Sequence, residues 1–486
     1  MDPSEYPAAL ADLHGRRSLN HAVVDRIVAS ILAVEIRIHV QSGANVELAS
    51  DLVRVLARIT PNIVLVAPPE IREILEPIRN ALAPVTGQGD THLDVEVGDD
   101  TLPAAVRVVA REWGVAVASP NQARPTLQAG PPVRPVAMVA ACLTAFRVMH
   151  EILPADFGAA PASQLLDLWD YGADTPAKAP YTSLEAVLVG LGSIGSTAAW
   201  LLALSVGQGK MTLIDPDVLK QENLARYVYM MPGDVDSKKV AWCADQFQDG
   251  IDLVAFDGKV EAWVAGLRSE PIRLMLVSPD RRTARRAAAD AMPERSISAT
   301  VNGLEASVNL GRLPTGPCSY CANMPGGVRP TLQHELATWT GLPYTRVLQL
   351  VPGVDGAYVD QPLDHRDITS IEMRWGCDVG SLGHWIGKTL RDMHSSEGHR
   401  RYAALVPSGT APAAEVTLPM PAASALAGAL MALEAIKAVD TRPYNHISYD
   451  ARSGRIQRGI RLPNQEGKCL CQHPERIEWF AALYGP

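Results

Sequence analysis

The chain has 486 residues, which is enough for two or three domains of about 150 residues each. Its 47% hydrophobic and 20% charged residues are typical of a folded globular protein and exclude a disordered or low-complexity chain. The net charge of −9 argues against a nucleic-acid partner, because proteins that follow a phosphate backbone concentrate Lys and Arg on one face.

The N-terminus carries neither the basic start nor the apolar run of a secretory signal, so we expect a cytoplasmic protein. The best candidate for a membrane span, Val136–Leu153, is interrupted by Arg147, His150 and Glu151. This stretch therefore predicts an amphipathic or buried helix, and we expect no membrane partner.

The first 170 residues predict a degenerate copy of the α/β plan that follows them. Strand candidates lie at 33–38, 62–66 and 115–117. Val64–Pro68 parallels Met275–Pro279 in sequence, and the helical stretch 136–153 parallels 421–439 in length and in Ala and Leu content. An unrelated α/β domain is the alternative, because Ala-rich helices resemble one another by composition. No Gly-rich turn follows the first strand, so a repeated domain here would lack a working nucleotide site.

Residues 171–182 contain Gly172 and two prolines but few apolar side chains, and they are the clearest linker. Beyond them, short apolar strands alternate with helical stretches. The strand candidates lie at 186–190, 211–215, 253–256, 273–277 and 296–301. This alternation predicts a Rossmann-like, doubly wound and mostly parallel sheet.

Residues 325–419 are rich in Gly, Pro and Trp and lack regular alternation, which predicts an inserted subdomain. The core then resumes with a helix that ends near Lys437 and a strand at 446–449. We therefore expect a degenerate adenylation-like domain at 1–170, a linker at 171–182, and an active domain at 183–486 that contains the insertion 325–419.

A glycine-rich turn follows the first strand of the second domain. Gly190, Gly192 and Gly195 fit the pattern G-x-G-x-x-G between a strand and a helix, where glycines let backbone N–H groups approach a phosphate. Asp215 ends the next strand, and its carboxylate is suited to accept hydrogen bonds from ribose hydroxyls. These residues suit NAD and ATP equally, so an NAD(P)-dependent oxidoreductase remains an alternative at this point.

The run that begins at Ile214 distinguishes the two nucleotides. It reads IDPDVLKQENLAR and then DVDSKK, and it resembles the ubiquitin-activating family, which includes the sulfur-carrier adenylyltransferases of thiamine and molybdopterin synthesis. The family's polar positions fall without a gap on Asp215, Asn223, Arg226 and Lys239. The resemblance covers the second domain outside the insertion. It implies that Asp215 holds the ribose of ATP, while Asn223, Arg226 and Lys239 face the phosphates.

Adenylation chemistry explains these residue types. A carboxylate that attacks the α-phosphate of ATP builds negative charge on phosphoryl oxygens, and fixed cations such as Arg226 and Lys239 offset it. Either cation alone would suggest a solvated surface charge, and the common register favours the phosphates. Asp280 falls where the family carries its Mg²⁺-binding aspartate. Two positions depart from the family: Ser193 replaces a second glycine, and Val277 replaces an aspartate often found before the Mg²⁺ ligand.

Two close cysteine pairs predict a zinc site. Cys318 and Cys321 form one pair and Cys469 and Cys471 the other, and together they supply the four thiolates of a closed, structural tetrahedral site. Related enzymes carry two C-x-x-C motifs at corresponding places, whereas the second pair here is C-x-C. Free thiols or a disulfide are the alternatives.

Three further cysteines remain. Cys142 and Cys243 lie in predicted helices, and we interpret them as packing residues. Cys377 lies in the insertion, where ubiquitin-activating enzymes place the cysteine that receives the activated carboxylate as a thioester. Arg374 favours a thiolate there, whereas Asp378 opposes it. We therefore expect Cys377 to be the thioester nucleophile, with an idle loop thiol as the alternative.

Members of this family complete their adenylation site with an arginine from a partner subunit. In a fused pair of domains, Arg16 and Arg17 are candidates for that role in cis. A surface pair of arginines is the alternative interpretation.

These features together predict a pseudo-dimer within one chain, although a homo-oligomer is also compatible with them. The arrangement most resembles an activating enzyme for a ubiquitin-like protein. The resemblance implies ATP, Mg²⁺ and Zn²⁺, a ubiquitin-like or sulfur-carrier partner with a C-terminal Gly, and a conjugating enzyme. The alternatives are adenylation of a sulfur carrier or a ribosomal peptide without an enzyme thioester, an NAD(P)-dependent oxidoreductase, and a non-catalytic scaffold.

Overall fold

The fold divides into two compact units, a larger one within residues 27–324 and 418–486 and a smaller one within residues 325–417. The computed structural model describes the following residues: 26, 29–41, 43–83, 89, 91–98, 106–120, 122, 127, 130–158, 160–171, 179–247, 250–267, 270–323, 332–352, 360–375, 378–394, 421–437, 443–463 and 469–485.

The larger unit begins with a six-stranded sheet and its helices. Its elements are β1 (Val34–Val40), α3 (Val46–Leu56), β2 (Ile63–Val66), α4 (Pro69–Leu82), β3 (Thr91–Val97), β4 (Val106–Arg111), β5 (Gly114–Ala118), α5 (Arg134–Ile152), α6 (Pro154–Phe157) and β6 (Gln164–Asp167). The strand order is β2-β1-β3-β4-β5-β6. The first four strands in this order are parallel, and β5 pairs antiparallel with β4 and β6.

An eight-stranded sheet follows in the same unit. Its elements are β7 (Ser183–Val189), α7 (Ser193–Ser205), β8 (Gln208–Ile214), η1 (Gln221–Asn223), η2 (Pro232–Asp234), α8 (Lys239–Asp245), β9 (Asp252–Phe256), α9 (Val260–Ala265), β10 (Leu274–Val277), α10 (Arg282–Asp290), β11 (Arg295–Asn302), β12 (Glu305–Arg312), η3 (Cys321–Asn323), α15 (Pro421–Ile436), β13 (His446–Asp450), β14 (Arg455–Gly459), η6 (Leu470–Gln472) and α16 (Pro474–Tyr484). The strand order is β9-β8-β7-β10-β11-β12-β13-β14. The first five strands in this order are parallel, and the remaining pairs are antiparallel.

The two sheets share one topology. Without β9 and β14, the second sheet has the order β8-β7-β10-β11-β12-β13, which matches β2-β1-β3-β4-β5-β6 in every neighbour and direction. The prediction of a Rossmann-like α/β fold with two mostly parallel sheets is therefore confirmed. We call the portion with β1 to β6 the first repeat and the portion with β7 to β14 the second repeat.

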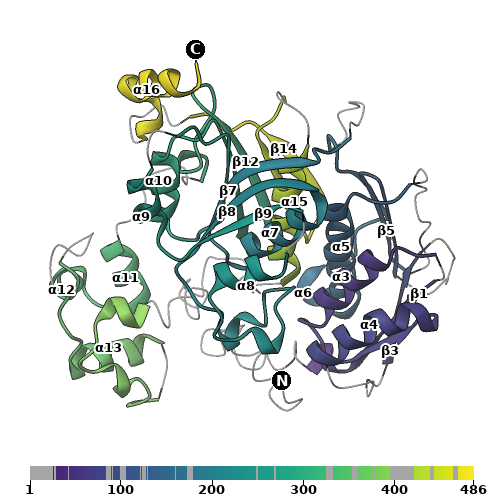
Figure 1. Ribbon diagram of the computed structural model, residues 1–486. Helices are drawn as coiled ribbons and strands as arrows, with labels where there is room; N and C mark the ends of the chain where they lie inside the picture. The colour runs from purple at the N-terminus through teal and green to yellow at the C-terminus, as the bar shows by residue number, and fades with distance from the viewer. Residues whose placement is uncertain are drawn as a thin grey trace. The chain divides into compact units, whose positions relative to one another are not determined.

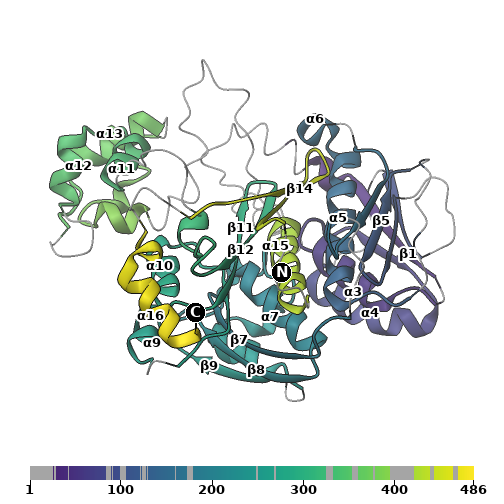
Figure 2. The same ribbon diagram turned by 90° about the horizontal axis from the view of Figure 1, so that it is seen from above.

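The helices α3, α5, α7 and α15 lie between the two sheets (Figures 1 and 2). α5 packs on α3, α15, β4 and β5, while α15 packs on α7, β11 and β12. Sixteen consecutive residues of α5 and all of α15 are buried, because each helix has neighbours on both sides. By length and composition alone α5 could cross a membrane, but 89% of that stretch is buried inside the protein, which agrees with the predicted buried helix.

The contact between α15 and α7 is close enough to require glycine at position 428. A Cβ at Gly428 would lie 2.5 Å from the carbonyl oxygen of Ile194 and 2.8 Å from the Cβ of Thr197. We therefore expect Gly428→Ala to lower the free energy of unfolding by about 1–3 kcal/mol, the usual cost of overpacking. Thermal unfolding measures this loss of stability. Gly233→Ala is the control, since a Cβ there meets nothing within 4 Å, and an equal loss in both variants would contradict the argument.

The smaller unit is helical. It contains α11 (Leu332–Thr340), α12 (Tyr344–Leu350), α13 (His365–Trp375) and η4 (Gly383–Trp385). Their apolar faces enclose a core that includes Trp339, Ile371 and Trp385. The Nε1 group of Trp375 donates to the carbonyl oxygen of Trp339 (2.8 Å). Cys377 lies outside the described residues.

Candidate functional site

The second sheet changes winding direction between β7 and β10. From β7 the chain continues to β8 on one side, and β10 pairs with β7 on the other, all three strands being parallel. In such sheets the crevice beyond the carboxyl ends of the strands is where ligands bind. Gly190, Asp215 and Ser278 directly follow these three strands, so the predicted nucleotide residues meet at the expected edge.

The loop after β7 requires glycine at positions 190 and 195. Gly190 has φ +86°, and a Cβ there would lie 2.9 Å from the backbone nitrogen of Pro279. A Cβ on Gly195 would collide with the carbonyl oxygen of Gly190 and lie 2.6 Å from the Oγ of Ser278. Gly192 caps α7 without a side-chain hydrogen bond, and open space surrounds its Cβ position. The N–H groups at the start of α7 are therefore left for a ligand, and this end of a helix favours an anion.

Asp215 connects this loop to the end of β8. Its carboxylate accepts hydrogen bonds from the backbone N–H groups of Leu191 (2.6 Å) and Asp217 (2.9 Å). Burial raises the pKa of Asp215, while the nearby Lys239 cation and these two hydrogen bonds oppose that rise. The carboxylate therefore fixes the loop and can also accept a hydrogen bond from a ribose hydroxyl.

Lys239 is the first residue of α8 and lies beside Asp215. Its Nζ is 3.1 Å from a carboxylate oxygen of Asp217 and 3.8 Å from one of Asp215. Burial acts to lower the pKa of Lys239, but Tyr227, Asp215 and Asp217 outweigh it and the pKa is raised. The side chain is thus a buried cation at neutral pH. Sequence reasoning missed Asp217, although its place in the Asp-Pro-Asp run was the available signal.

Asn223 and Arg226 lie on a compact turn between β8 and α8. The Asn223 Oδ1 accepts a hydrogen bond from the backbone N–H of Lys220 (3.0 Å), and the backbone N–H of Arg226 donates to the Asn223 carbonyl (2.9 Å). The Nε of Arg226 is buried and has no hydrogen-bond partner among the described residues. A buried donor without a partner fits a site whose anionic ligand completes it.

Asp280 is exposed in the loop between β10 and α10, at the same edge of the sheet. Burial lowers the pKa of the neighbouring Arg285 to about 10, and the Asp280 carboxylate opposes that shift. An exposed carboxylate at the same edge as the glycine loop fits Mg²⁺, which commonly uses one or two carboxylates and completes its shell with phosphates and water.

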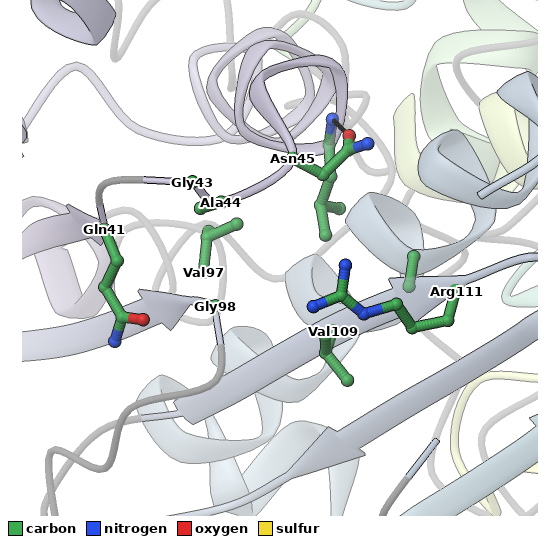
Figure 3. Close-up of a pocket in the computed structure, with 10 residues that line it drawn as sticks. Gln41, Gly43, Ala44, Asn45, Val97, Gly98, Val109 and Arg111 are labelled. Atoms are coloured by element: carbon green, nitrogen blue, oxygen red, sulfur yellow. Dashed lines mark hydrogen bonds between the residues drawn. The ribbon is translucent and has the colours of Figure 1, made fainter. Parts of the chain in front are cut away.

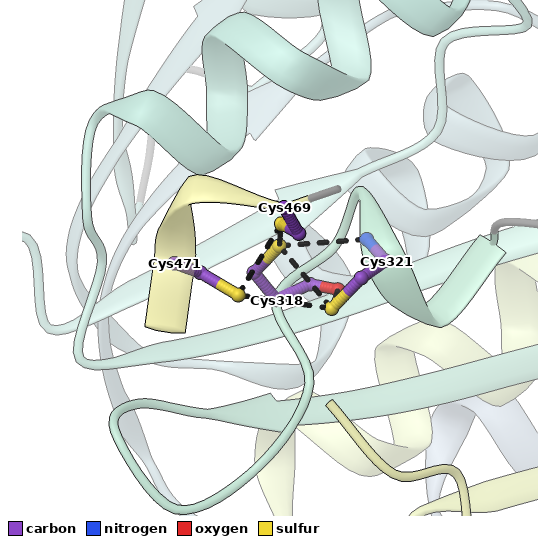
Figure 4. Close-up of side chains that lie close together, drawn as sticks. All are labelled: Cys318, Cys321, Cys469 and Cys471. Atoms are coloured by element: carbon purple, nitrogen blue, oxygen red, sulfur yellow. Dashed lines mark hydrogen bonds between the residues drawn. The ribbon is translucent and has the colours of Figure 1, made fainter. Parts of the chain in front are cut away.

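The four predicted zinc ligands meet in one cluster (Figure 4). Cys318 and Cys321 follow β12, Cys469 and Cys471 lie at η6, and their four Sγ atoms lie within 4.8 Å of one another. The shortest Sγ–Sγ distances are 3.3–3.8 Å, close to the roughly 3.8 Å edge of a tetrahedron with Zn–S bonds of about 2.3 Å. No pair is near the disulfide length of about 2.05 Å, so the disulfide alternative is wrong in this structure. The donor set fits structural zinc.

The structure describes Cys142 and Cys243, two of the three cysteines outside the cluster. Cys142 and Cys243 are buried, and burial raises the pKa of both thiols, that of Cys243 to about 12. This agrees with their interpretation as packing residues. Arg16 and Arg17, like Cys377, lie outside the described residues.

The first repeat has its own hollow at the equivalent edge (Figure 3), with a volume of about 200 Å³. Gly43, with φ +81°, lies in the loop before α3, and the Arg111 side chain extends from the end of β4. The N-terminus of α3 has its own cap, because the Asn45 side chain accepts from the Leu48 N–H (2.6 Å). Ala67 follows β2 where Asp215 follows β8, so the first repeat has no counterpart of the Asp215 carboxylate at this position.

The chain is similar to several known proteins. The model of the ThiF family matches residues 163–471. The chain is 23% identical over 366 residues to "Uncharacterized protein y4jF" of Sinorhizobium fredii (strain NBRC 101917 / NGR234), across 71% of this chain and 69% of that protein. Two structures of MccB are also similar, one from E. coli with succinimide and one of the "Microcin C7 biosynthetic enzyme MccB in complex with N-formylated MccA". Each has 12% identity and a TM-score of 0.32, and covers 76% of this chain and 98% of MccB.

Proposed function

Because the chain belongs to the ThiF family of adenylyltransferases, we propose that it adenylates the C-terminal carboxylate of a ubiquitin-like protein and then forms a thioester with it. ATP-dependent adenylation of a protein or peptide is the activity of this family. The proposal rests on one observation: at one edge of the second sheet, the Asp215 carboxylate accepts the N–H of Leu191 in the glycine loop and lies 3.8 Å from the Lys239 Nζ.

We assign the steps to residues as follows. The N–H groups at the start of α7 and the glycine loop bind phosphate oxygens, while Asp215 holds the ribose. An oxygen of the substrate carboxylate attacks the α-phosphorus, the bond to the bridging oxygen breaks, and pyrophosphate leaves. Asn223, Arg226 and Lys239 stabilise the charge that develops on the phosphoryl oxygens. Asp280 would hold Mg²⁺, which supplies Lewis-acid stabilisation of the same charge.

The first repeat has no adenylation activity in this proposal. Ala67 replaces the ribose-binding aspartate, and Asn45 already caps the helix whose counterpart binds phosphate in the second repeat. The chain is then a pseudo-dimer of one inactive and one active domain, with zinc in the active one. We place it in the cytoplasm, where ATP is available.

The smaller unit would carry the second step. The Cys377 thiolate attacks the acyl carbon of the adenylate, AMP leaves, and the thiol proton passes to solvent. Hydrogen bonds fix the described residues before and after Cys377. The Trp375 Nε1 group donates to the Trp339 carbonyl, and the Glu372 carboxylate accepts the N–H groups of Gly380 and Leu382. A thioester made here would pass to a conjugating enzyme.

We expect the purified chain with Mg²⁺ to exchange radiolabelled pyrophosphate into ATP only with a suitable substrate. The panel is ubiquitin-fold proteins and synthetic peptides that end in Gly. Exchange with a ubiquitin-fold protein supports the proposal, exchange with peptides alone favours a peptide-modifying enzyme, and no ATP binding would overturn adenylation.

The thioester is tested separately with Cys377→Ala. This variant is expected to keep full exchange and to lose the carrier–enzyme adduct that thiol reagents cleave on a non-reducing gel. Cys243→Ala is the matched control, because that thiol is buried and unreactive, and it should keep the adduct. An adduct that survives in Cys377→Ala would remove the role of Cys377 and favour the sulfur-carrier or peptide alternatives.

A further inference from the structure

The segment that carries Asn223 and Arg226 exists in only one of the two repeats. Residues 215–238 separate β8 from α8, whereas only Ala67 and Pro68 separate β2 from α4. The two repeats are therefore asymmetric at this point. We call residues 223–231 the Arg226 segment.

The Arg226 segment consists of two consecutive hydrogen-bonded turns. The N–H groups of Arg226 and Tyr227 donate to the carbonyl of Asn223 (2.9 and 3.0 Å), and the N–H of Met230 donates to the carbonyl of Tyr227 (3.2 Å). Within the described part of the chain, the Arg226 Nε has no hydrogen-bond partner. The position of this guanidinium thus depends on the backbone of its segment.

The far end of the segment is held by α3 and α5 of the first repeat. The Tyr229 hydroxyl donates to Oδ1 of Asp51 (3.0 Å), and Nη2 of Arg134 donates to both the Tyr229 oxygen (3.2 Å) and Asp51 Oδ1 (2.9 Å). Nη2 of Arg58 donates to the backbone carbonyl of Met230. Both the side chain and the backbone at this end are therefore fixed by the other repeat.

Ring packing and charge pairing both fix the position of Tyr229. The Tyr229 ring stacks on Trp200 of α7 with centroids 4.7 Å apart and an interplanar angle of 5°, and the Arg54 guanidinium lies 5.4 Å from the same ring. Asp51 is fully buried and pairs with Arg134. Asp51, Arg134 and Tyr229 are hydrogen-bonded to one another, and a buried network of this kind specifies one arrangement, because any other leaves a charge unpaired in a low dielectric.

We infer that the first repeat positions Arg226: Asp51, Arg134 and Arg58 hold Tyr229 and Met230, and thereby direct the guanidinium three residues earlier toward the phosphates of ATP. Asp51, Arg134, Arg58 and Tyr229 are positioning residues, since they act through Arg226. The inference rests on the proposed function for the role of Arg226. It gives the inactive repeat a task in the active site.

The test measures Kd by calorimetry for Mg-ATP and for adenosine, so it needs no carboxylate substrate. Tyr229→Phe removes one hydroxyl and keeps the ring stack. We expect it to weaken Mg-ATP binding about tenfold, which corresponds to ~1.4 kcal/mol, and adenosine binding less than twofold. In an Arg226→Ala background the same change should alter the Kd for Mg-ATP by less than about twofold, the usual error of additivity.

Tyr171→Phe is the matched control, because it also removes a buried tyrosine hydroxyl, one that donates to the buried Glu434 (2.8 Å). This variant should leave both Kd values unchanged. Tyr229→Phe with wild-type affinity for Mg-ATP, or with the same loss in the Arg226→Ala background, would overturn the inference while leaving adenylation in place. A wild-type chain that binds adenosine and Mg-ATP with equal affinity would overturn both this inference and the proposed function, since no residue would then act on the phosphates.

Discussion

Lys239→Ala is expected to lower substrate-dependent pyrophosphate exchange by at least about a hundredfold, the scale seen when one preorganised group is removed from a charged transition state. Lys239 is buried beside Asp215 and Asp217, with 3.1 Å between its Nζ and the Asp217 carboxylate. Its loss removes the cation proposed to face the phosphates and leaves the Asp215 and Asp217 carboxylates without their nearby cation. Calorimetry with Mg-ATP should therefore also show weaker binding.

The adjacent residue provides the control. Lys238 carries the same charge but is exposed, and its Nζ lies 3.1 Å from the exposed carboxylate of Asp257. Exposed pairs contribute little, so Lys238→Ala should keep exchange within about twofold of wild type. Full exchange in Lys239→Ala would remove the phosphate role from this residue. Equal losses in both variants would show that the protein's overall charge is responsible.

The spacing of the polar residues from Asp215 to Lys239 is explained by a segment that folds back on itself. An isolated bridge pairs Val218 with Lys238, and the N–H of Leu219 donates to the carbonyl of Ser237 (2.8 Å). This closure returns the chain to its starting point and brings Lys239 beside Asp215. Sequence spacing could match the residues to a family, but only the fold shows that Asp217 holds the cation in place.

Several strands escaped prediction because they are not apolar runs. In β3, Asp94 and Glu96 alternate with apolar residues. Asp94 pairs with His39 of the neighbouring strand β1 (2.7 Å), and Glu96 pairs with Gln41, the residue directly after that strand (2.6 Å). Likewise, β12 (Glu305–Arg312) alternates polar and buried residues. A search for short apolar runs finds strands covered on both faces and overlooks strands with one polar face.

The contacts that join the two repeats could not be predicted from the sequence either. Nothing in the composition of α3 or α5 distinguishes Asp51 and Arg134 from surface charges, because their partner Tyr229 lies 178 residues from Asp51 in the chain. The repeat itself was easier to predict, since α5 and α15 are both long apolar helices, of 19 and 16 residues. Local patterns thus predicted the two sheets, whereas the contacts that join them depend on long-range packing.

Loss of the zinc ligands is expected to release the C-terminal helix. The cysteine cluster joins the end of β12 to η6, from which α16 continues, and Phe480 of α16 packs in the same buried cluster. The chain purified without chelator should contain about one equivalent of zinc, as a closed four-thiolate site holds one ion. Cys471→Ser should lose the metal, unfold at lower temperature and expose α16 to limited proteolysis, because metal binding stabilises the folded state directly.

Cys243→Ala separates loss of metal from loss of a buried thiol. Cys243 is as buried as the cluster residues but lies on α8, so this variant should keep its zinc and an uncleaved α16 while losing some stability to a small cavity. Tyr484 gives α16 a second anchor, since its hydroxyl accepts the N–H of Ile272 (2.8 Å). Proteolytic cleavage of α16 should therefore be faster in the double variant Cys471→Ser, Tyr484→Phe than in Cys471→Ser alone. Wild-type protein with less than about a tenth of an equivalent of zinc, and α16 equally resistant in all variants, would contradict a structural metal at these four thiols.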